Sequence, residues 1–144
     1  MHQFTIYIVV YIAMIANFFW EAYSEGRNAW DKGKLGWKIK IGNYTVLTAY
    51  HFYLFIIMWP VLLSLPLFLN GWDIRLFGIL LSAYISGLVI QDFFWYVVNP
   101  VVKVKELNSD FAIYYPRLKI GKIKIPIGYF IGIILAVVIN MVLV

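Results

Sequence analysis

Acidic and amide side chains recur at helical spacing in the first part of the chain. Asn17, Glu21, Glu25 and Asn28 are separated by four, four and three residues. Residues at these intervals lie on one face of a helix, one above the other. The spacing therefore predicts a polar stripe on a helix that continues to about Asn28.

A histidine and a third acidic residue occur on two later segments. His51 comes shortly after two threonines, either of which is a suitable helix N-cap. Asp92 and Asn99 are seven residues apart and share a helix face. If these segments are antiparallel neighbours of the first helix, Glu21, His51 and Asp92 lie at a similar depth. The predicted result is a cluster of carboxylates and one imidazole.

Helix dipoles make such a cluster unfavourable without a cation. The C-terminal end of a helix disfavours a carboxylate, and the N-terminal end keeps an imidazole neutral. Either Arg27 and the loop lysines supply the positive charge, or a divalent metal ion does. Carboxylates combined with imidazole suit Zn, Mn or Fe. A di-iron centre is not expected, because the Glu-x-x-His spacing of such sites does not occur.

The candidate roles follow from these residue types. The candidate metal ligands are Glu21, Glu25, His51 and Asp92. The candidate acid–base catalysts are Glu21, His51 and Asp92. Asn28 and Asn99 are expected to orient them. The alternatives are a structural network of hydrogen bonds and ion pairs, and a relay for protons or substrate.

Four long apolar segments must position these residues. They run over residues 4–22, 46–69, 74–98 and 127–144, and each matches the about 20 residues that cross a bilayer as a helix. Hydrophobic residues make up 63% and charged residues 13% of the 144, with a mean hydropathy of +0.82. The sequence predicts an all-α, antiparallel bundle of four transmembrane helices, in a single integral membrane domain over residues 1–144.

The basic residues predict the orientation of this bundle. Of the 12 lysines and arginines, five lie between residues 23 and 45 and six between residues 99 and 126. Cytoplasmic loops are enriched in such residues. We therefore expect a multi-pass protein of the cell membrane with both loops in the cytoplasm and both termini outside. The expected partners of the lysines are anionic lipid headgroups, not nucleic acid.

Local patterns add three expectations. Lys and Ile alternate in residues 37–41 and 118–125, which predicts two short strands that could pair as one small sheet. Pro60 and Pro66 predict a kink in the second helix. Small residues recur every four positions from Gly78 and from Gly128, which predicts close helix packing within the bundle or in a homo- or hetero-oligomer.

The polar motifs also carry a resemblance. The segments 21–26 (Glu-Ala-Tyr-Ser-Glu-Gly), 47–51 (Leu-Thr-Ala-Tyr-His) and 91–100 (Gln-Asp-Phe-Phe-Trp-Tyr-Val-Val-Asn-Pro) together resemble a family of small prokaryotic four-span membrane proteins with no assigned activity. The resemblance adds weight to Glu21, Glu25, His51, Asp92 and Asn99 as a set. Two departures would remove potential ligands. An acidic residue is expected where this chain has Gln91, and a Trp-His pair where it has Pro116-Arg117.

Two function classes are compatible with these observations. The first is a small metal-binding protein or enzyme that acts at the boundary of lipid and cytosol. The second is a non-catalytic membrane subunit or scaffold whose polar cluster is structural. The chain has no cysteine, which excludes disulfides and thiol chemistry. Nine lysines against three arginines, together with abundant isoleucine, are typical of a thermophile.

Overall fold

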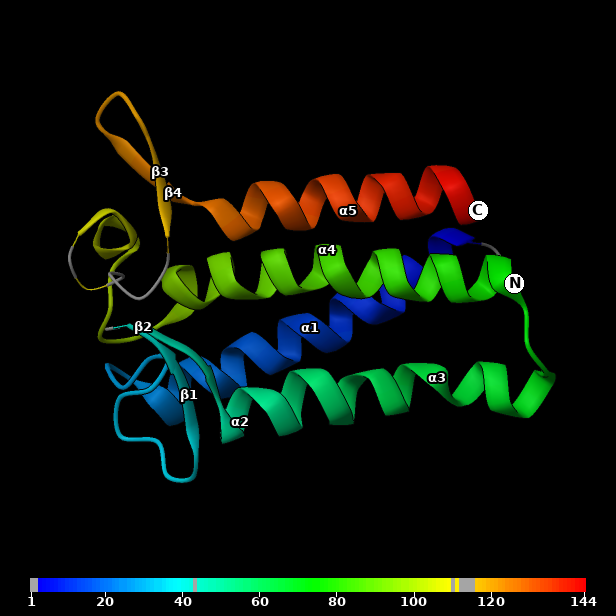
Figure 1. The fold of residues 1–144 in the computed structure, drawn as a ribbon, viewed down its shortest axis with the longest axis horizontal. Helices are drawn as coiled ribbons and strands as arrows, with labels where there is room; N and C mark the ends of the chain where they lie inside the picture. Colours follow the sequence, from blue (N-terminus) through cyan, green and yellow to red (C-terminus); the bar gives the residue numbers. More distant parts are fainter. Residues whose placement is uncertain (1–2, 43, 110, 112–115) are drawn as a thin grey trace.

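In the part of the chain that the structure describes, the fold is a bundle of four helical rods with two β-hairpins, and the hairpins lie at one end of the bundle (Figure 1). It is known from a computed structural model that describes residues 3–42, 44–109, 111 and 116–144. The rods are α1 (Gln3–Glu25), α4 (Ile74–Val98), α5 (Ile127–Leu143), and a continuous rod made of α2 (Ala49–His51), η1 (Phe52–Met58) and α3 (Trp59–Asn70). This confirms a mostly helical protein.

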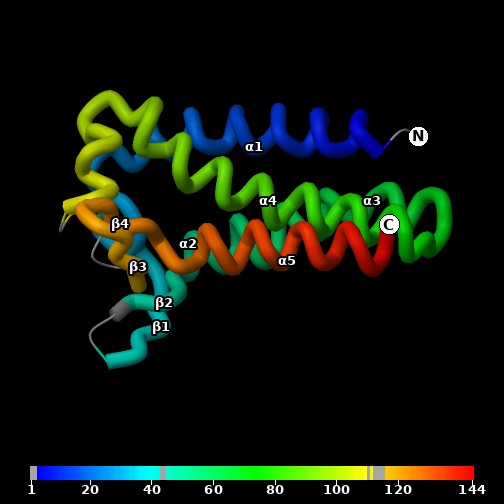
Figure 2. The backbone as a smooth tube through the Cα atoms, turned by 90° about the horizontal axis from the view of Figure 1, so that it is seen from above, coloured from blue at the N-terminus to red at the C-terminus, as the bar shows by residue number. Residues whose placement is uncertain are grey.

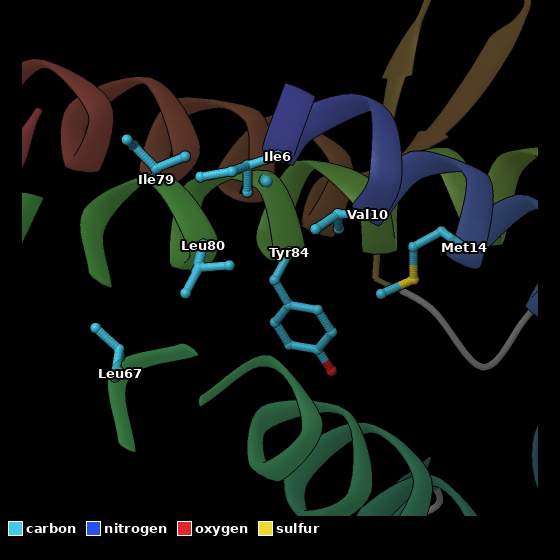
Figure 3. Packing of buried hydrophobic residues seen from close by; sticks show 8 residues of the cluster. Ile6, Val10, Met14, Leu67, Ile79, Leu80 and Tyr84 are labelled. Atoms are coloured by element: carbon cyan, nitrogen blue, oxygen red, sulfur yellow. The ribbon is translucent and has the colours of Figure 1, made fainter. Parts of the chain in front are cut away.

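Helix α4 is the centre of the bundle. It packs mainly against α1 and α5 and touches the α2–η1–α3 rod more sparsely, and Figure 2 shows it between α1 and α5. Ile6, Val10 and Met14 repeat every four residues on α1, so they form one apolar stripe that packs against α4. The same core includes Leu67 of α3 and Tyr84 of α4 (Figure 3).

Three of the rods are long and apolar enough to cross a membrane. They are Gln3–Glu25, Ala49–Asn70 and Ile74–Val98, with 23, 22 and 25 residues. The fourth, α5, is apolar but has only 17 residues. Large apolar side chains such as Val9, Phe68 and Ile134 point outward, as expected where lipid replaces water around the bundle.

The two hairpins correct the expected strand pairing. Strand β1 (Lys38–Ile41) pairs with β2 (Tyr44–Thr48), and β3 (Arg117–Ile120) pairs with β4 (Ile123–Pro126), both antiparallel. The residues 118–125 are therefore two strands joined by a turn, not one strand. Gly121 at the turn has a φ of +61°, which fits the first position of a two-residue type II′ turn. The close return of the chain explains why each strand pairs locally.

The second rod contains a π-helical segment where the sequence predicts a proline kink. The N–H of Trp59 bonds to the carbonyl oxygen of Leu54, five residues back. The carbonyl oxygen of Phe55 thereby loses its α-helical donor, and residue 60 is a proline without an N–H. The hydroxyl of Tyr84 donates to this oxygen instead. Figure 3 shows Tyr84 reaching from α4 toward this rod.

The small residues on α4 and α5 bring these two helices together within one chain. A Cβ at Gly132 would lie 2.6 Å from Val89, and one at Gly78 would lie 2.6 Å from Leu143. A Cβ at Gly128 would meet nothing within 4 Å. Most of the predicted stripe therefore serves packing inside the bundle.

Candidate functional site

Glu21 is the most buried carboxylate of the predicted cluster, with 3% of its surface exposed. It lies on the inner face of α1 because it continues the stripe from Val10 through Met14 and Asn17. Asn17 Nδ2 donates to Glu21 Oε2 at 3.2 Å. Gln91 Nε2 donates to the same oxygen, and the Tyr50 hydroxyl donates to Oε1 at 2.8 Å. Three elements thus converge on one carboxylate.

Glu25, one turn further along α1, is paired with a lysine. Lys34 Nζ lies 2.5 Å from Glu25 Oε1, and each of these side chains is only 10% exposed. The same ammonium donates to the carbonyl oxygen of Asn28 at 2.8 Å and lies 5.1 Å from the centre of the Tyr50 ring. Lys34 is therefore the cation that compensates this part of the cluster.

His51 is the last residue of α2 and is held by the threonine that begins that helix. Thr48 is the N-cap, and its Oγ1 accepts the backbone N–H of His51 at 3.3 Å. The same Oγ1 lies 2.7 Å from His51 Nδ1. When the ring proton is on Nδ1, this contact leaves the lone pair of Nε2 available as a metal ligand. The Trp30 ring lies against the imidazole, with centroids 4.3 Å apart.

These three residues form a group that could hold a metal ion. One ligand atom from each of Glu21, Glu25 and His51 lies within 4.8 Å of the others. Ligands of a tetrahedral zinc lie about 2.0–2.2 Å from the ion and so roughly 3.4 Å from one another. Side-chain movements of about 1 Å would bring the three ligand atoms to the spacing that a tetrahedral zinc requires.

Asp92 borders the same cavity but has another partner. The cavity has a volume of about 280 Å³, and Glu21, Glu25, His51 and Asp92 all line it. Asp92 Oδ2 accepts the hydroxyl of Tyr129 from α5. Asp92 therefore lines the cavity together with the three-residue group but is not one of its members.

The two predicted orienting residues act mainly through the backbone. Asn99, 5% exposed, follows α4 and donates to the carbonyl oxygen of Gly26 at 2.8 Å. Its Oδ1 accepts the N–H groups of Val101 and Val102, both at 2.9 Å. Asn99 thereby holds the end of α1 against the turn that follows α4. Asn28 contributes the carbonyl oxygen that binds Lys34.

Trp95 was not singled out from sequence as a functional residue, and the structure places it in the cavity wall. It is 5% exposed. Its indole N–H lies near the Glu25 carboxylate, yet it makes no hydrogen bond of normal geometry with any described residue. A ligand oxygen in this cavity would supply the acceptor that the N–H lacks.

Four other side chains of the site were also missed as functional residues. Gln91 stood next to a candidate, and Lys34 was one of several loop lysines. Tyr50 and Trp30 gave no signal beyond their proximity to His51 and Glu25 in sequence. The positions of Lys34 and Trp30 depend on how the loop over residues 26–37 folds, with positive φ at Trp30, Gly33 and Gly36.

Arg27, the other cation considered for the cluster, binds a different carboxylate. Its Nη2 lies 2.7 Å from Glu106 Oε2 and its Nη1 lies 3.2 Å from Oε1, a two-pronged pair. This bond, the Lys103 backbone N–H and the guanidinium charge lower the pKa of Glu106 to about 2. Arg27 thus links the two loops, and the cation that pairs with a carboxylate of the cluster is Lys34.

Comparison with protein-family models, with curated proteins and with solved structures finds no match to this chain.

Proposed function

We propose that this chain is a small multi-pass membrane protein that binds one divalent metal ion through Glu21, Glu25 and His51. The observation that carries the proposal is the convergence of two carboxylates and one imidazole to within 4.8 Å. Carboxylate and imidazole ligands favour Zn, Mn or Fe. An ionisable cluster within a membrane bundle marks a functional site more often than a packing device.

The site would exchange one cation for another. Lys34 neutralises Glu25 when no metal is bound, because its Nζ lies 2.5 Å from Oε1. A divalent ion between Glu21, Glu25 and His51 repels this ammonium and takes over its role. Thr48 keeps the imidazole in position, since it contacts both Nδ1 and the backbone N–H of His51.

A substrate of this site would be an amphiphile. The cavity wall joins the charged residues to Phe55, Ile56 and Leu88, which lie further into the bundle. A polar group would sit beside the metal, and an apolar chain would follow these three side chains. Asp92 and the unpaired N–H of Trp95 supply an acceptor and a donor for that polar group.

Equilibrium dialysis of the purified protein against Zn²⁺, Mn²⁺ and Fe²⁺ tests the proposal. We expect about one ion per chain for one of these metals, and a loss of affinity of at least about tenfold in His51→Ala. His2→Ala removes the other histidine of the sequence and is the matched control. Equal binding by wild type and His51→Ala would contradict the proposal.

The second candidate is a scaffold in which the cluster is structural. It is favoured by the three donors on Glu21 and by the Lys34–Glu25 ion pair, which together satisfy both carboxylates without a metal. On this account Glu21→Gln costs stability, because its partners are left unpaired, and neither wild type nor variant retains metal. Thermal unfolding in detergent, measured together with metal content, separates the two candidates.

The proposed location is the cell membrane, with both hairpins in the cytoplasm. The support is the charge pattern together with the fold, in which both hairpins lie at one end of the bundle and the α3–α4 turn at the other (Figure 1). The metal site, near the hairpin end, would then open toward the cytoplasm.

A further inference from the structure

The β3–β4 hairpin has one apolar face and one basic face. Its register places Leu118 opposite Ile125 and Ile120 opposite Ile123. Successive side chains of a strand point to opposite faces. These four residues therefore share one face, and the lysines between them lie on the other.

The apolar face is largely uncovered. Leu118, Ile120 and Ile123 are 46%, 53% and 59% exposed. Contiguous apolar side chains on the outside of a protein mark a contact with another protein or with a membrane. The hairpin is small, so three such residues make up most of this face.

The basic face carries uncompensated charge. Lys119 lies directly opposite Lys124, and like charges in such a pair destabilise a hairpin. Lys122 adds a third charge at the turn. The ion pairs found among residues 3–42, 44–109, 111 and 116–144 use Arg27 and Lys34, not these lysines. An anionic surface would remove the repulsion.

The hairpin is held in a fixed orientation by the preceding 3₁₀-helix, η2 (Val104–Asn108). Asn108 Nδ2 donates to the carbonyl oxygen of Lys122 at 3.0 Å, and Asn108 Oδ1 accepts the N–H of Lys124 at 2.6 Å. Arg117 donates to the carbonyl oxygen of Ser109 at 2.8 Å. These bonds fix the hairpin at both of its strands.

That orientation lies across the helix axes and not along them. Figure 1 shows the hairpin extending sideways beyond α5. Ile123, Lys124 and Ile125 line a hollow together with Phe93 of α4 and Tyr129 of α5. The hairpin therefore lies beside the ends of these two helices, where the bilayer surface would be if the helices cross it.

We propose that the β3–β4 hairpin is an amphipathic element that lies on the surface of the bilayer crossed by the helices. Its apolar face enters the boundary between headgroups and acyl chains. Lys119, Lys122 and Lys124 bind anionic phosphate headgroups. The partner is the lipid surface itself. This inference needs the helices to cross a membrane but does not need the metal site.

Fluorescence at single cysteines tests this proposal, because the native chain has no cysteine. The full chain carrying Ile123→Cys, labelled with a polarity-sensitive dye, is reconstituted in phosphatidylcholine vesicles with and without phosphatidylglycerol. We expect blue-shifted emission and quenching by lipids with a spin label near the headgroup. Quenching should be several-fold weaker for Lys119→Cys, the matched control on the opposite face.

The lysines are tested by replacing Lys119, Lys122 and Lys124 with glutamine in the Ile123→Cys chain. We expect phosphatidylglycerol to deepen the dye in the parent and to have no effect in the triple variant. A dye at residue 123 that emits as in water in both vesicle types would overturn the proposal, as would equal quenching at residues 119 and 123. Equal quenching with and without phosphatidylglycerol would reject the anionic lipid as partner.

Discussion

Lys34 is the residue that decides between a structural and a metal-binding cluster. Its ammonium lies 2.5 Å from Glu25 and is bound by the carbonyl oxygen of Asn28, so it is held in place by two acceptors. A like charge close to a bound cation weakens binding strongly in a site partly shielded from water. Lys34 and a metal ion therefore compete for Glu25.

Lys34→Met should tighten metal binding by at least about tenfold, since it removes this repulsion. The metal-free variant should lose about 3–5 kcal/mol of stability, because Glu25 is left buried without its partner, and added metal should restore it. Metal titration and thermal unfolding in detergent measure both effects. Lys38→Met is the control, because Lys38 Nζ binds the carbonyl oxygen of Asp31 at 2.7 Å. Weaker metal binding by Lys34→Met would count against competition.

Sequence reasoning reached part of this site because part of it is local. The row from Asn17 to Glu21 follows from helical spacing, and the Thr48 cap fixes His51 within one turn. Lys34 and Gln91 could not be assigned in this way. Lys34 reaches Glu25 through a loop with glycines at positive φ, and Gln91 reaches Glu21 from 70 residues away.

The Arg27–Glu106 pair should make stability depend on pH at the acid end. The pKa of Glu106 is lowered from its ordinary value of 4.5 to about 2 in the folded protein. The stabilisation is therefore fully present above pH 4.5 and is lost as the pH falls through about 2. Unfolding curves of wild type and Arg27→Gln should converge over this window. Arg75→Gln, at the other end of the bundle, is the control. A constant difference between the curves down to pH 2 would disagree with the low pKa.

At the scale of elements, the second rod shows how a proline is accommodated. The sequence predicts a kink at Pro60, whereas the structure has a π-helical segment, η1, immediately before it. The carbonyl oxygen of Phe55 has no backbone donor in either helical register, and the Tyr84 hydroxyl replaces it. The sequence could not show this, because the donor comes from a different helix.

Tyr84→Phe should therefore destabilise the protein by about 1–3 kcal/mol, the cost of an unsatisfied buried carbonyl group. The loss should be smaller when Pro60→Ala is also present, because residue 60 then offers an N–H close to Phe55. Thermal unfolding of the two single variants and the double variant measures this coupling. Tyr53→Phe, which alters an exposed tyrosine of the same rod, should change little. An equal loss in both backgrounds would argue against the role assigned to Pro60.

At the scale of the whole molecule, 11 of the 12 lysines and arginines lie between residues 23 and 45 or between residues 99 and 126, and this charge pattern predicts the proposed orientation. Hydrophobic spacing was enough to predict four helical segments, and α4 begins and ends at the predicted residues 74 and 98. Two helix ends were wrong, because α1 ends at Glu25 and not near Asn28, and residues 46–48 belong to β2 and not to the second helix. The helices pack through small residues, because a Gly132 without a Cβ leaves room for Val89. The hairpins were only partly predicted, since alternation indicates strands but does not say which strands pair.

Cysteine labelling of intact cells should reveal the proposed orientation. A cysteine at Trp72, 70% exposed in the α3–α4 turn, should react with an impermeant thiol reagent from outside. Cysteines at Leu35 and Lys122 should react only after the membrane is permeabilised. Leu35 is 91% exposed, so burial would not explain its protection. Labelling of Leu35→Cys from outside would reverse the topology.

The proposed binding of one metal ion by Glu21, Glu25 and His51 is tested most directly by the X-ray absorption spectrum of the zinc-loaded protein. We predict a four- or five-coordinate zinc with oxygen and nitrogen ligands at about 2.0–2.2 Å, including one imidazole. The imidazole scattering should vanish in His51→Ala and persist in His2→Ala. A wild-type spectrum without imidazole, or one unchanged by His51→Ala, would contradict the account.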